Sequence, residues 1–439
     1  MIAEEVPQPE GEEPAPKKRK AKPDDRALRF AELYHDRARY DHDVGKWFVW
    51  DGQIWRMNGD GLALEWARGI CRVAGLRGGE AVLVERYARV DRRLAVTSAV
   101  WDADPMLLGT PGGTVDLRDG SLRQADQGDC ITRCTAVAPA EEDCAPPVRW
   151  LQFLDEAMQG DQERIRFLQV VAGYCLTGQT IEHALFFNHG GGGNGKSVYA
   201  NTIRKIMGDY ACVAAMETFI HTKGDQHPTS IAALRGARFV VASETERGRS
   251  WNESLIKRIS GGDPMKARFM RQDEFEFDPQ LKLWVLGNNK PALKHIDEAI
   301  RRRFKMVPWL FKPAHKNPRL EEELREEWPA ILRWAIEGCL DWQAEGMPLP
   351  AAVDAETKRY FEEQDSLRQW MDECCDVDPE HVPPGAQIRC LSGKLFASWA
   401  EWCKRNGEDA GSNKSFSADL TARGFEKMPT RMGAQFLRI

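Results

Sequence analysis

A glycine-rich octapeptide between a predicted strand and a predicted helix is the feature that most constrains this chain. Residues 190–197 read Gly-Gly-Gly-Gly-Asn-Gly-Lys-Ser and fit the pattern G-x-x-x-x-G-K-[ST]. The apolar run Ala184–Phe187 precedes them, and the helix-compatible stretch Ser197–Met207 follows. At an average glycine usage of roughly 7%, such a match arises by chance in about one or two of a hundred chains of this length. A flexible linker is the alternative, but a linker is not expected to join a strand to a helix.

The pattern predicts a loop that binds the phosphates of ATP. Glycines allow the backbone to wrap around a phosphate with its N–H groups pointing inward, and the start of the following helix adds positive potential. Lys196 is expected to reach the β- and γ-phosphates, and Ser197 is expected to ligate Mg²⁺. The residues expected to bind the nucleotide are Gly190, Gly191, Gly192, Gly193, Asn194, Gly195, Lys196, Ser197 and Val198.

A second predicted strand ends in acidic residues that are expected to complete the magnesium site. The apolar run that starts at Phe239 is followed by Glu244 and Glu246. Hydrolysis of a nucleoside triphosphate needs a carboxylate that holds magnesium and polarises the attacking water. Glu244, the first acid after the strand, is predicted to take this role, and Glu246 lies on the same face if the strand continues. Without the upstream loop, two exposed surface acids would be the default interpretation.

Two further polar segments follow in the order that a shared ATP site requires. The apolar run that starts at Leu281 ends in Asn288 and Asn289, either of which is a candidate to orient the attacking water. Arg302 and Arg303 are candidates for an arginine that a neighbouring subunit contributes to stabilise charge on the γ-phosphate. Taken alone, an asparagine turn and a solvated basic run are the ordinary interpretations.

A basic segment between these motifs predicts a hairpin that faces DNA. Lys266, Arg268 and Arg271 lie along one arm, and Phe275 and Phe277 alternate along the next. Basic side chains beside aromatic ones suit a single strand of nucleic acid, whose backbone is negative and whose bases stack. A surface hairpin without a ligand is an equal alternative.

Composition excludes several classes of protein. The 439 residues carry a formal net charge of −6, which argues against a basic surface over the whole chain but not against a local basic channel. No apolar run is long enough for a membrane span and no signal segment is apparent, so a cytoplasmic protein is expected, in a bacterial host if a phage or plasmid encodes it. Eleven scattered cysteines indicate a reduced interior, and Cys130-x-x-x-Cys134 lacks the second pair of a zinc site.

Hydrophobic periodicity and turn residues divide the chain into segments. Residues 1–25 are rich in Pro, Glu and Lys and are expected to be disordered, with Lys17–Lys20 as a solvated run or a nucleic-acid patch. Helices are expected at 26–40, 148–177, 318–346 and 350–375, and a hairpin at 46–57. Buried parallel strands of an α/β core are expected at 184–187, 239–242 and 281–286.

The last segment, residues 387–439, has the opposite charge to the whole chain. It holds nine Lys and Arg against five acids, a balance of +4. Helices are expected at Lys394–Arg405 and Asn413–Arg423, and a wing at Phe425–Ile439. Lys414 and Arg423 are candidate contacts to DNA phosphates. A small α+β domain with a mildly basic face is a nearly equal alternative.

In this order, the motifs resemble those of the superfamily-three helicases, which are AAA+-like. The closest likeness is to the helicase portion of phage and plasmid primase-helicases and of poxvirus-type nucleoside triphosphatases. The resemblance rests on Gly192–Ser197, on Ala-Ser-Glu-Thr-Glu at 242–246, on the basic segment 256–268 and on Asp-Glu-Ala-Ile-Arg-Arg-Arg-Phe at 297–304. It is dense over 181–312 and looser outside that range.

The resemblance implies roles for individual residues. Lys196 and Ser197 match the nucleotide and magnesium ligands, Glu244 matches the acid of the second nucleotide motif, and Asn288 matches the sensor asparagine. Arg302 or Arg303 matches the arginine finger, and the basic hairpin lies in the region that family members use to contact DNA.

Two positions depart from the family pattern. Gly287 stands where threonine usually precedes the sensor asparagine, and Arg301 stands where an aromatic residue usually precedes the paired arginines. The second departure leaves the register of the finger open.

The resemblance also implies an architecture and an activity. The expected fold is α/β, with an AAA+-type P-loop core, a helix-rich α+β N-terminal domain and a C-terminal winged-helix-like domain. The expected divisions are a tail (1–25), the N-terminal domain (26–147), a helical collar (148–180), the ATPase core (181–315), a helical extension (316–376) and the winged-helix-like domain (387–439). The segment ahead of the core is too short for a primase domain.

The expected activity is that of an ATP-dependent DNA helicase. It would form a ring, which is expected to be a hexamer, on single-stranded or forked DNA. The expected setting is the replication of a phage, plasmid or integrated element. A separate primase or replication initiator is a candidate partner. The alternatives are an origin-binding initiator or packaging factor without processive unwinding, and a P-loop phosphotransferase, which would need no basic hairpin and no arginine in trans.

Overall fold

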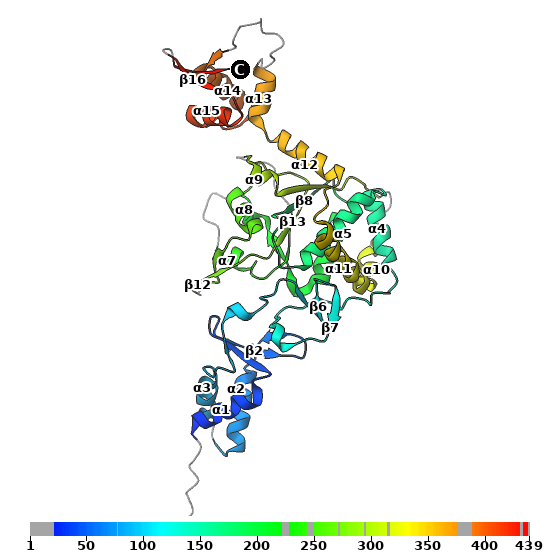
Figure 1. The fold of residues 1–439 in the computed structure, drawn as a ribbon, viewed down its shortest axis with the longest axis vertical. Helices are drawn as coiled ribbons and strands as arrows, with labels where there is room; N and C mark the ends of the chain where they lie inside the picture. Colours follow the sequence, from blue (N-terminus) through cyan, green and yellow to red (C-terminus); the bar gives the residue numbers. More distant parts are fainter. Residues whose placement is uncertain are drawn as a thin grey trace, which may run out of the picture.

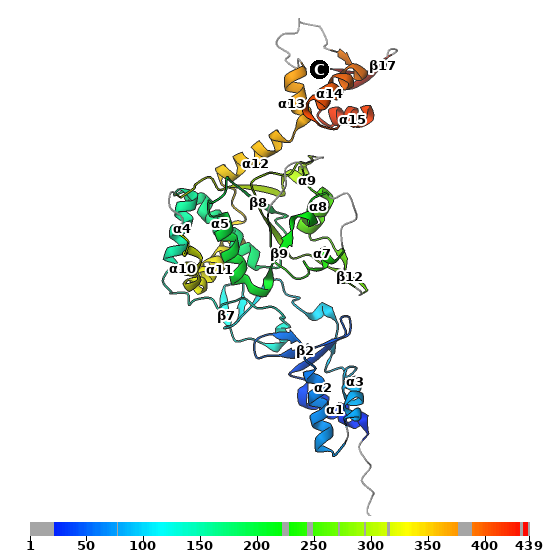
Figure 2. The ribbon, with the colours of Figure 1, turned by 180° about the vertical axis from the view of Figure 1, so that it is seen from behind.

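Three structural units follow one another along the long axis of the molecule (Figures 1 and 2). An N-terminal unit lies at one end, a layered α/β unit in the middle, and a small helical unit with a three-stranded sheet at the other end. The computed structural model describes residues 22–76, 78–221, 228–243, 249–270, 273–293, 296–313, 317–375, 389–430 and 433–437. The expected fold class is confirmed as far as a mixed α/β fold with a parallel sheet.

The middle unit is built on a five-stranded sheet in which every neighbouring pair is parallel. Its order is β14-β8-β13-β10-β9. The strands are β8 (Leu185–His189), β9 (Ala211–Ala215), β10 (Phe239–Ser243), β13 (Lys282–Gly287) and β14 (Phe304–Pro308). Near-continuous apolar runs suit strands that are buried on both faces, so the three predicted parallel strands are confirmed.

Helices cover both faces of this sheet, because successive side chains of each strand point to opposite sides. Phe186 packs into the apolar core on one face, and its neighbours Leu185 and Phe187 pack into the core on the other. The first core is formed with α4 (Val148–Met158), α5 (Gln162–Leu176), α6 (Lys196–Met207), α10 (Leu320–Glu326) and α11 (Trp328–Glu345). The second is formed with α7 (Pro228–Ala232), α8 (Glu253–Gly261), α9 (Glu298–Arg301) and α12 (Ala351–Glu363).

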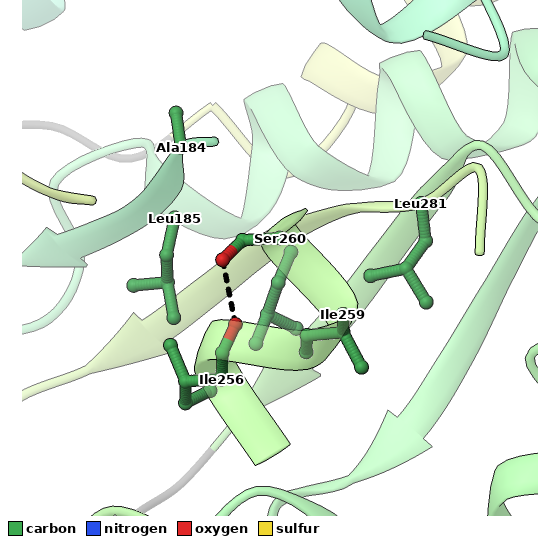
Figure 3. Close-up of a pocket in the computed structure, with 7 residues that line it drawn as sticks. Ala184, Leu185, Ile256, Ile259, Ser260 and Leu281 are labelled. Carbon is green, nitrogen blue, oxygen red and sulfur yellow. Dashed lines mark hydrogen bonds between the residues drawn. The ribbon is translucent and has the colours of Figure 1, made fainter. Parts of the chain in front are cut away.

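Helix α8 closes tightly over the amino ends of β8 and β13. Figure 3 shows Ile256 and Ile259 of α8 directed between Leu185 and Leu281, with the hydroxyl of Ser260 bonded to the carbonyl of Ile256 at 2.6 Å. The apolar space that they enclose is too small to hold a water molecule. The contact between α8 and the amino ends of these strands is therefore tightly packed core.

Helices α5 and α11 cross at two glycines. A Cβ on Gly173 would lie 2.1 Å from the backbone nitrogen of Cys339, and a Cβ on Gly338 would lie 2.2 Å from the carbonyl oxygen of Gln169. Only glycine allows the two backbones to approach this closely. The crossing fixes α11, which comes after the sheet in sequence, against α5, which comes before it.

Two buried cations bind the carboxyl end of α5. Arg238, at the start of β10, donates to the carbonyl of Leu176 at 2.6 Å, and Lys282, at the start of β13, donates to the carbonyl of Thr177. Cations stabilise the carbonyl end of a helix, where the last C=O groups lack partners. No described carboxylate pairs with Lys282, and burial lowers its pKa to about 7.

The N-terminal unit packs three helices against a four-stranded sheet of order β3-β2-β1-β4. Its elements are α1 (Pro23–Tyr34), β1 (Ala38–Asp41), β2 (Lys46–Trp50), β3 (Trp55–Met57), α2 (Leu62–Val73), α3 (Gly79–Ala88) and β4 (Ala95–Val96). A second, antiparallel sheet lies between this unit and the middle one (Figure 1) and contains β5 (Leu107–Thr110), β6 (Gly113–Asp116) and β7 (Ser121–Arg123). The predicted hairpin at 46–57 is confirmed, because β2 and β3 are antiparallel neighbours.

The helix predicted at 26–40 was too long. Helix α1 ends at Tyr34, and Ala38–Asp41 form strand β1. This strand pairs with β2 on one side and with β4 on the other. Pairing with two strands that lie later in the chain outweighs the weak helical preference of these residues.

The C-terminal unit is held together by tryptophans. Its elements are α13 (Ser366–Cys374), β15 (Arg389–Leu391), α14 (Ser392–Asn406), α15 (Asn413–Ala422), β16 (Lys427–Thr430) and β17 (Gly433–Leu437). Trp370 of α13 packs in one core with Trp399 and Trp402 of α14. Helix α13 was expected in the preceding helical extension, but its apolar side is buried in the C-terminal unit, which therefore starts before residue 387.

Helix α12 joins the middle unit to the C-terminal one (Figures 1 and 2). It lies along β14, which is the outer strand of the sheet, and the hydroxyl of Thr357 accepts a hydrogen bond from the backbone N–H of Met306 at 3.0 Å. No helix in the described ranges is long and apolar enough to cross a membrane. The tail with Lys17–Lys20 and the predicted linker at 376–385 lie outside the described residues.

Candidate active site

A cleft opens at the carboxyl ends of the parallel strands. Its volume is about 1370 Å³, and its walls come from the glycine-rich loop, the ends of β9, β10 and β13, and parts of α4 and α10. The chain leaves β8 through α6 to reach β9 at the far edge, and later returns to place β14 on the other side of β8. Ligands of open parallel sheets bind at the carboxyl ends of the strands where the order reverses in this way.

The backbone of the loop requires glycine at two positions above all. Gly190 has φ of +156°, and a Cβ there would lie 2.0 Å from the carbonyl oxygen of Trp309. Gly195 has φ of +91°, and a Cβ there would lie 2.9 Å from the ring of Phe153. Asn194 fixes the turn between them, because its side-chain amide donates to the same Trp309 carbonyl. The loop is thus held from behind by the residue that follows β14.

Lys196 is a buried cation whose hydrogen-bond partners among the described residues are all neutral. Its Nζ donates to the carbonyl of Gly190 at 2.7 Å, to Oδ1 of Asn194 at 3.1 Å and to Oδ1 of Asn288 at 3.4 Å. The side chain is 6% exposed, and burial lowers its pKa. Burial of a cation is costly unless negative charge compensates it, and a phosphate in the cleft would supply such charge.

The start of α6 adds to the affinity for an anion. The helix begins at Lys196 and its N-cap is Gly195, so no side chain caps its first N–H groups. Ser197, in the first turn, is exposed and lines the cleft. The N–H groups at the start of a helix and the helix dipole favour an anion at this point, beside the exposed hydroxyl of Ser197.

Strand β13 brings Asn288 to the loop. Residues 283–287 pair in parallel with residues 185–189 of β8, so both strands end side by side. Asn288 is exposed and lines the cleft together with Asn289. The structure brings Lys196 and the asparagine segment together, and Asn288 is the asparagine whose side chain accepts from Lys196.

The predicted acids follow directly from another lining residue. Ser243, the last residue of β10, lines the cleft and pairs with Leu286 of β13. Glu244 and Glu246 come next but lie outside the described residues. No group of three or more metal-ligating side chains occurs among the described residues, which include Cys130 and Cys134.

Part of the cleft wall was not predicted from the sequence. Arg149 and Phe153 of α4, Glu217 after β9 and Phe311 after β14 all line it. Arg149 is held at the rim by Glu323 at 2.8 Å. Glu217 is the first acid after β9, and the rule that selected Glu244 would have selected it as well. Arg149, Phe153 and Phe311 belong to no sequence motif, because tertiary packing alone brings α4 and Phe311 to the loop.

The two candidate arginines have different environments. Arg303 is buried; its Nε donates to the hydroxyl of Ser260 at 3.0 Å, one of its terminal nitrogens donates to the carbonyl of Ala299 at 2.6 Å, and burial lowers its pKa. Arg302 is exposed, and neither arginine lines the cleft of its own chain. Arg301 lies over the ring of Phe361, 5.0 Å from its centroid. Of the two candidates, only Arg302 is exposed at the surface.

The predicted basic hairpin is confirmed as a hairpin. Strands β11 (Met265–Arg268) and β12 (Glu274–Phe277) are antiparallel, and Lys266 and Arg268 are exposed. They stand opposite Glu276 and Glu274, which moderates the positive charge of the arm. Arg271 lies outside the described residues.

The tip of the hairpin has an apolar surface that the sequence prediction missed. Phe269 is 37% exposed and Met270 is 70% exposed. The ring of Phe269 stacks on that of Phe275 with centroids 5.3 Å apart. An exposed, supported ring next to basic side chains is suited to stacking against a base.

The two candidate DNA contacts of the C-terminal unit also differ. Lys414 is exposed in the first turn of α15. Arg423 makes a double hydrogen bond with the carboxylate of Asp365, at 2.5 and 3.1 Å. The charge of Arg423 is neutralised within the protein, between α15 and the N-cap of α13. Lys414 is therefore the better placed of the two to contact a DNA phosphate.

Two family descriptions match parts of the chain. "D5 N terminal like" matches residues 27–159, and "Family of unknown function (DUF5906)" matches residues 188–303. "Putative helicase L207/L206" of Acanthamoeba polyphaga mimivirus is 24% identical over 328 residues, which are 70% of this chain and 34% of that protein. "Putative helicase 022R" of Frog virus 3 (isolate Goorha) is 25% identical over 286 residues, 60% of this chain and 28% of that protein. The chain therefore spans about a third, or less, of the length of these relatives.

Solved structures share the fold over most of the chain. The A form apo structure of the NrS-1 C-terminal region has a TM-score of 0.51 and 10% sequence identity, with 92% of this chain and 96% of that chain covered. A second apo structure of the same region has a TM-score of 0.52 and 11% identity, with 92% and 95% covered. At this identity the likeness concerns the fold alone.

Proposed function

Since this chain carries a D5 N-terminal-like domain and is a homologue of viral proteins named as helicases, we propose that it is an ATP-dependent DNA helicase of the superfamily-three type. Its middle unit would be an AAA+-type P-loop core, and its C-terminal unit a winged-helix-like domain. Replication of a phage, plasmid, virus or integrated element is the setting in which such a motor acts.

The observation that carries the proposal is the environment of Lys196. Its ammonium group is buried and is bonded to three neutral oxygens at the closed end of the cleft. A triphosphate there would replace these oxygens with charged ones. The partner Asn288 comes from the neighbouring strand, which is where a residue that senses the γ-phosphate has to lie.

Magnesium and the nucleobase can be assigned to different residues that line the cleft. Ser197 fits a magnesium ligand because its hydroxyl is exposed beside the loop, and Glu244 would complete the metal site and polarise water. The base would lie against Phe153 of α4 or Phe311 after β14, which are the aromatic residues that line the cleft. Magnesium would stabilise the negative charge of the phosphates during hydrolysis.

Completion of the site requires a second subunit. Arg302 is exposed and does not line its own cleft, so it would act on the γ-phosphate bound by a neighbouring subunit. Repetition of such a head-to-tail contact generates a closed ring, and a hexamer is the size we propose. The hairpin tip with Phe269 and Lys414 of the C-terminal unit would then contact single-stranded or forked DNA.

The test is ATP hydrolysis by the full chain with and without single-stranded DNA. Wild type should hydrolyse ATP with magnesium and be stimulated by DNA, and Lys196→Ala should lose hydrolysis while keeping its melting temperature. Lys205→Ala is the matched control, because Lys205 lies on the same helix but pairs with Glu321 at the surface. Wild-type turnover in Lys196→Ala would refute the proposal, and turnover that DNA does not affect would favour a phosphotransferase or an assembly factor.

A further inference from the structure

One carboxylate oxygen on α12 contacts both segments that hold Lys196. Oε1 of Glu356 accepts from Nζ of Lys290 at 2.8 Å and lies 3.1 Å from Nε2 of His189, without hydrogen-bond geometry in the second case. The three side chains are 11%, 16% and 9% exposed for Glu356, Lys290 and His189. Arg359, one turn further along α12, also donates to this oxygen at 2.8 Å.

His189 and Lys290 lie in the sequence close to two residues that accept hydrogen bonds from Lys196. His189 directly precedes Gly190, whose carbonyl accepts from Lys196 at 2.7 Å. Lys290 comes two residues after Asn288, whose Oδ1 accepts from Lys196 at 3.4 Å. A movement of Glu356 would therefore shift two of the three oxygens that surround the ammonium group of Lys196.

The segment after Asn288 is attached to α12 at further points. The hydroxyl of Tyr360 donates to the carbonyl of Pro291 at 2.5 Å, and the backbone N–H of Leu293 donates to Oε1 of Gln364 at 3.2 Å. Phe361 of the same helix lies under the guanidinium of Arg301. Helix α12 is thus the element against which the asparagine segment and the arginine run are both placed.

We propose that Glu356 is a positioning residue of the ATP site, acting through His189 and Lys290 on the phosphate loop and on Asn288. This inference rests on the proposed function, since it assigns a role within that ATPase. Glu356 is not among the residues that line the cleft. Its removal should leave phosphate binding by the loop in place and displace the group that orients the attacking water.

Helix α12 also extends this role toward the C-terminal unit. It ends at Glu363, and Asp365, the N-cap of the next helix, is paired with Arg423 of α15. A change in the position of α12 would therefore be passed to the unit that carries Lys414. Contacts of this kind couple two sites only if the element between them has two arrangements, which the experiment below detects.

The experiment compares Glu356→Gln with Asp354→Asn in the full-length protein. Both variants remove one negative charge from α12, but the ion pair between Asp354 and Lys358 is an exposed i,i+4 pair. We expect Glu356→Gln to lower kcat for ATP by about 10- to 100-fold with KM changed less than about threefold, because misplacement of a catalytic group costs turnover and not binding. Asp354→Asn should keep wild-type kcat, KM and melting temperature.

A second readout separates positioning from loss of fold. The affinity for single-stranded DNA is measured with and without a non-hydrolysable ATP analogue, at a temperature where both variants are folded. Wild type and Asp354→Asn should show a nucleotide-dependent change in DNA affinity, and Glu356→Gln should show a smaller one. Glu356→Asp, which keeps the charge on a shorter side chain, should recover part of the lost kcat.

The outcomes distinguish this inference from the proposed function. Wild-type kcat in Glu356→Gln would overturn the role of Glu356 while leaving the ATPase intact. An equal loss in Asp354→Asn would overturn it too, because charge on α12 in general would then be responsible. A wild-type protein that hydrolyses no ATP would refute the proposed function, and this inference with it.

Discussion

Lys196 and Asn288 meet at 3.4 Å although they lie on different strand-to-loop connections. The first belongs to the loop after β8 and the second to the turn after β13, and the parallel pairing of these strands brings both to one edge of the sheet. Asn288 is thereby within reach of the phosphate that Lys196 would bind. Its exposed amide is the group best placed to orient water beside that phosphate.

Replacement of Asn288 by Ala should separate hydrolysis from binding. The loop and Lys196 remain, so the affinity for a fluorescent ATP analogue should change by less than about threefold. The turnover rate should fall by about 100-fold, the size expected when one polar group that acts on the transition state is lost. Stopped-flow binding and steady-state hydrolysis measure the two quantities. A loss of binding that parallels the loss of turnover would instead make Asn288 a simple ligand of ATP.

The exposed Arg302 and the buried Arg303 predict opposite results on substitution. Arg302→Ala should keep the wild-type melting temperature and lose about 1000-fold in hydrolysis, as for other arginines supplied in trans. Arg303→Ala should lower the melting temperature, because it breaks the bond to Ser260 and leaves a cavity under α8.

A mixture of two inactive variants tests whether Arg302 acts between subunits. Arg302→Ala subunits have an intact loop, and Lys196→Ala subunits have an intact arginine. If they are mixed before assembly, some junctions combine both intact halves, so hydrolysis should exceed that of either variant alone. If Arg302 served its own chain, mixing would give no recovery.

The pKa of Lys282 predicts how stability depends on pH. Burial lowers the pKa of this lysine from 10.5 to about 7, so between these values the unfolded chain binds a proton that the folded chain does not. The free energy of unfolding should therefore rise through this window as the pH increases, and the cost of burying the charge is fully present below pH 7. Urea unfolding of wild type and Lys282→Met at pH 7 and pH 9 measures this.

The comparison with Lys282→Met is needed because buried thiols change the free energy of unfolding with pH in the opposite direction. Burial raises the pKa of Cys175 to about 12, so such thiols lower the stability of the folded state as the pH increases. The difference between wild type and the variant isolates the lysine. That difference should grow in favour of wild type with pH, and a constant difference would show that Lys282 stays charged in the fold.

The crossing of α5 and α11 predicts a strong effect of one added methyl group. Gly173→Ala should reduce the free energy of unfolding by about 1–3 kcal/mol, because the new Cβ would meet the backbone of Cys339 and the helices would have to separate. Gly79→Ala is the control, since no atom lies within 4 Å of a Cβ at that position in α3. Equal denaturation midpoints for the two variants would contradict the close crossing.

The parts of the site that follow apolar strands were predictable from the sequence. Lys196 and Asn288 each come just after such a run, and the carboxyl ends of parallel strands meet at one edge. The choice between Arg302 and Arg303 was not predictable, because it depends on the rotation of the short helix α9. The Arg423–Asp365 pair was also hidden, since 58 residues separate its members.

The contribution of α4 and α12 to the site depends on tertiary packing alone. Phe153 precedes the loop by 37 residues, and Glu356 follows it by more than one hundred and fifty. Neither belongs to a motif, and each lies on an ordinary amphipathic helix. No pattern of residue types reveals which helix will cover an edge of a sheet.

The bond between Thr357 and the backbone of Met306 has a practical consequence. Strand β14 is an outer strand, and α12 occupies the side on which another strand could add. A shortened protein that ends before residue 350 would expose this row of backbone groups, which is a template for aggregation. The smallest well-behaved form of the ATPase should therefore retain α12, and insolubility of shorter forms would reflect an uncovered strand and not a failure of the nucleotide site.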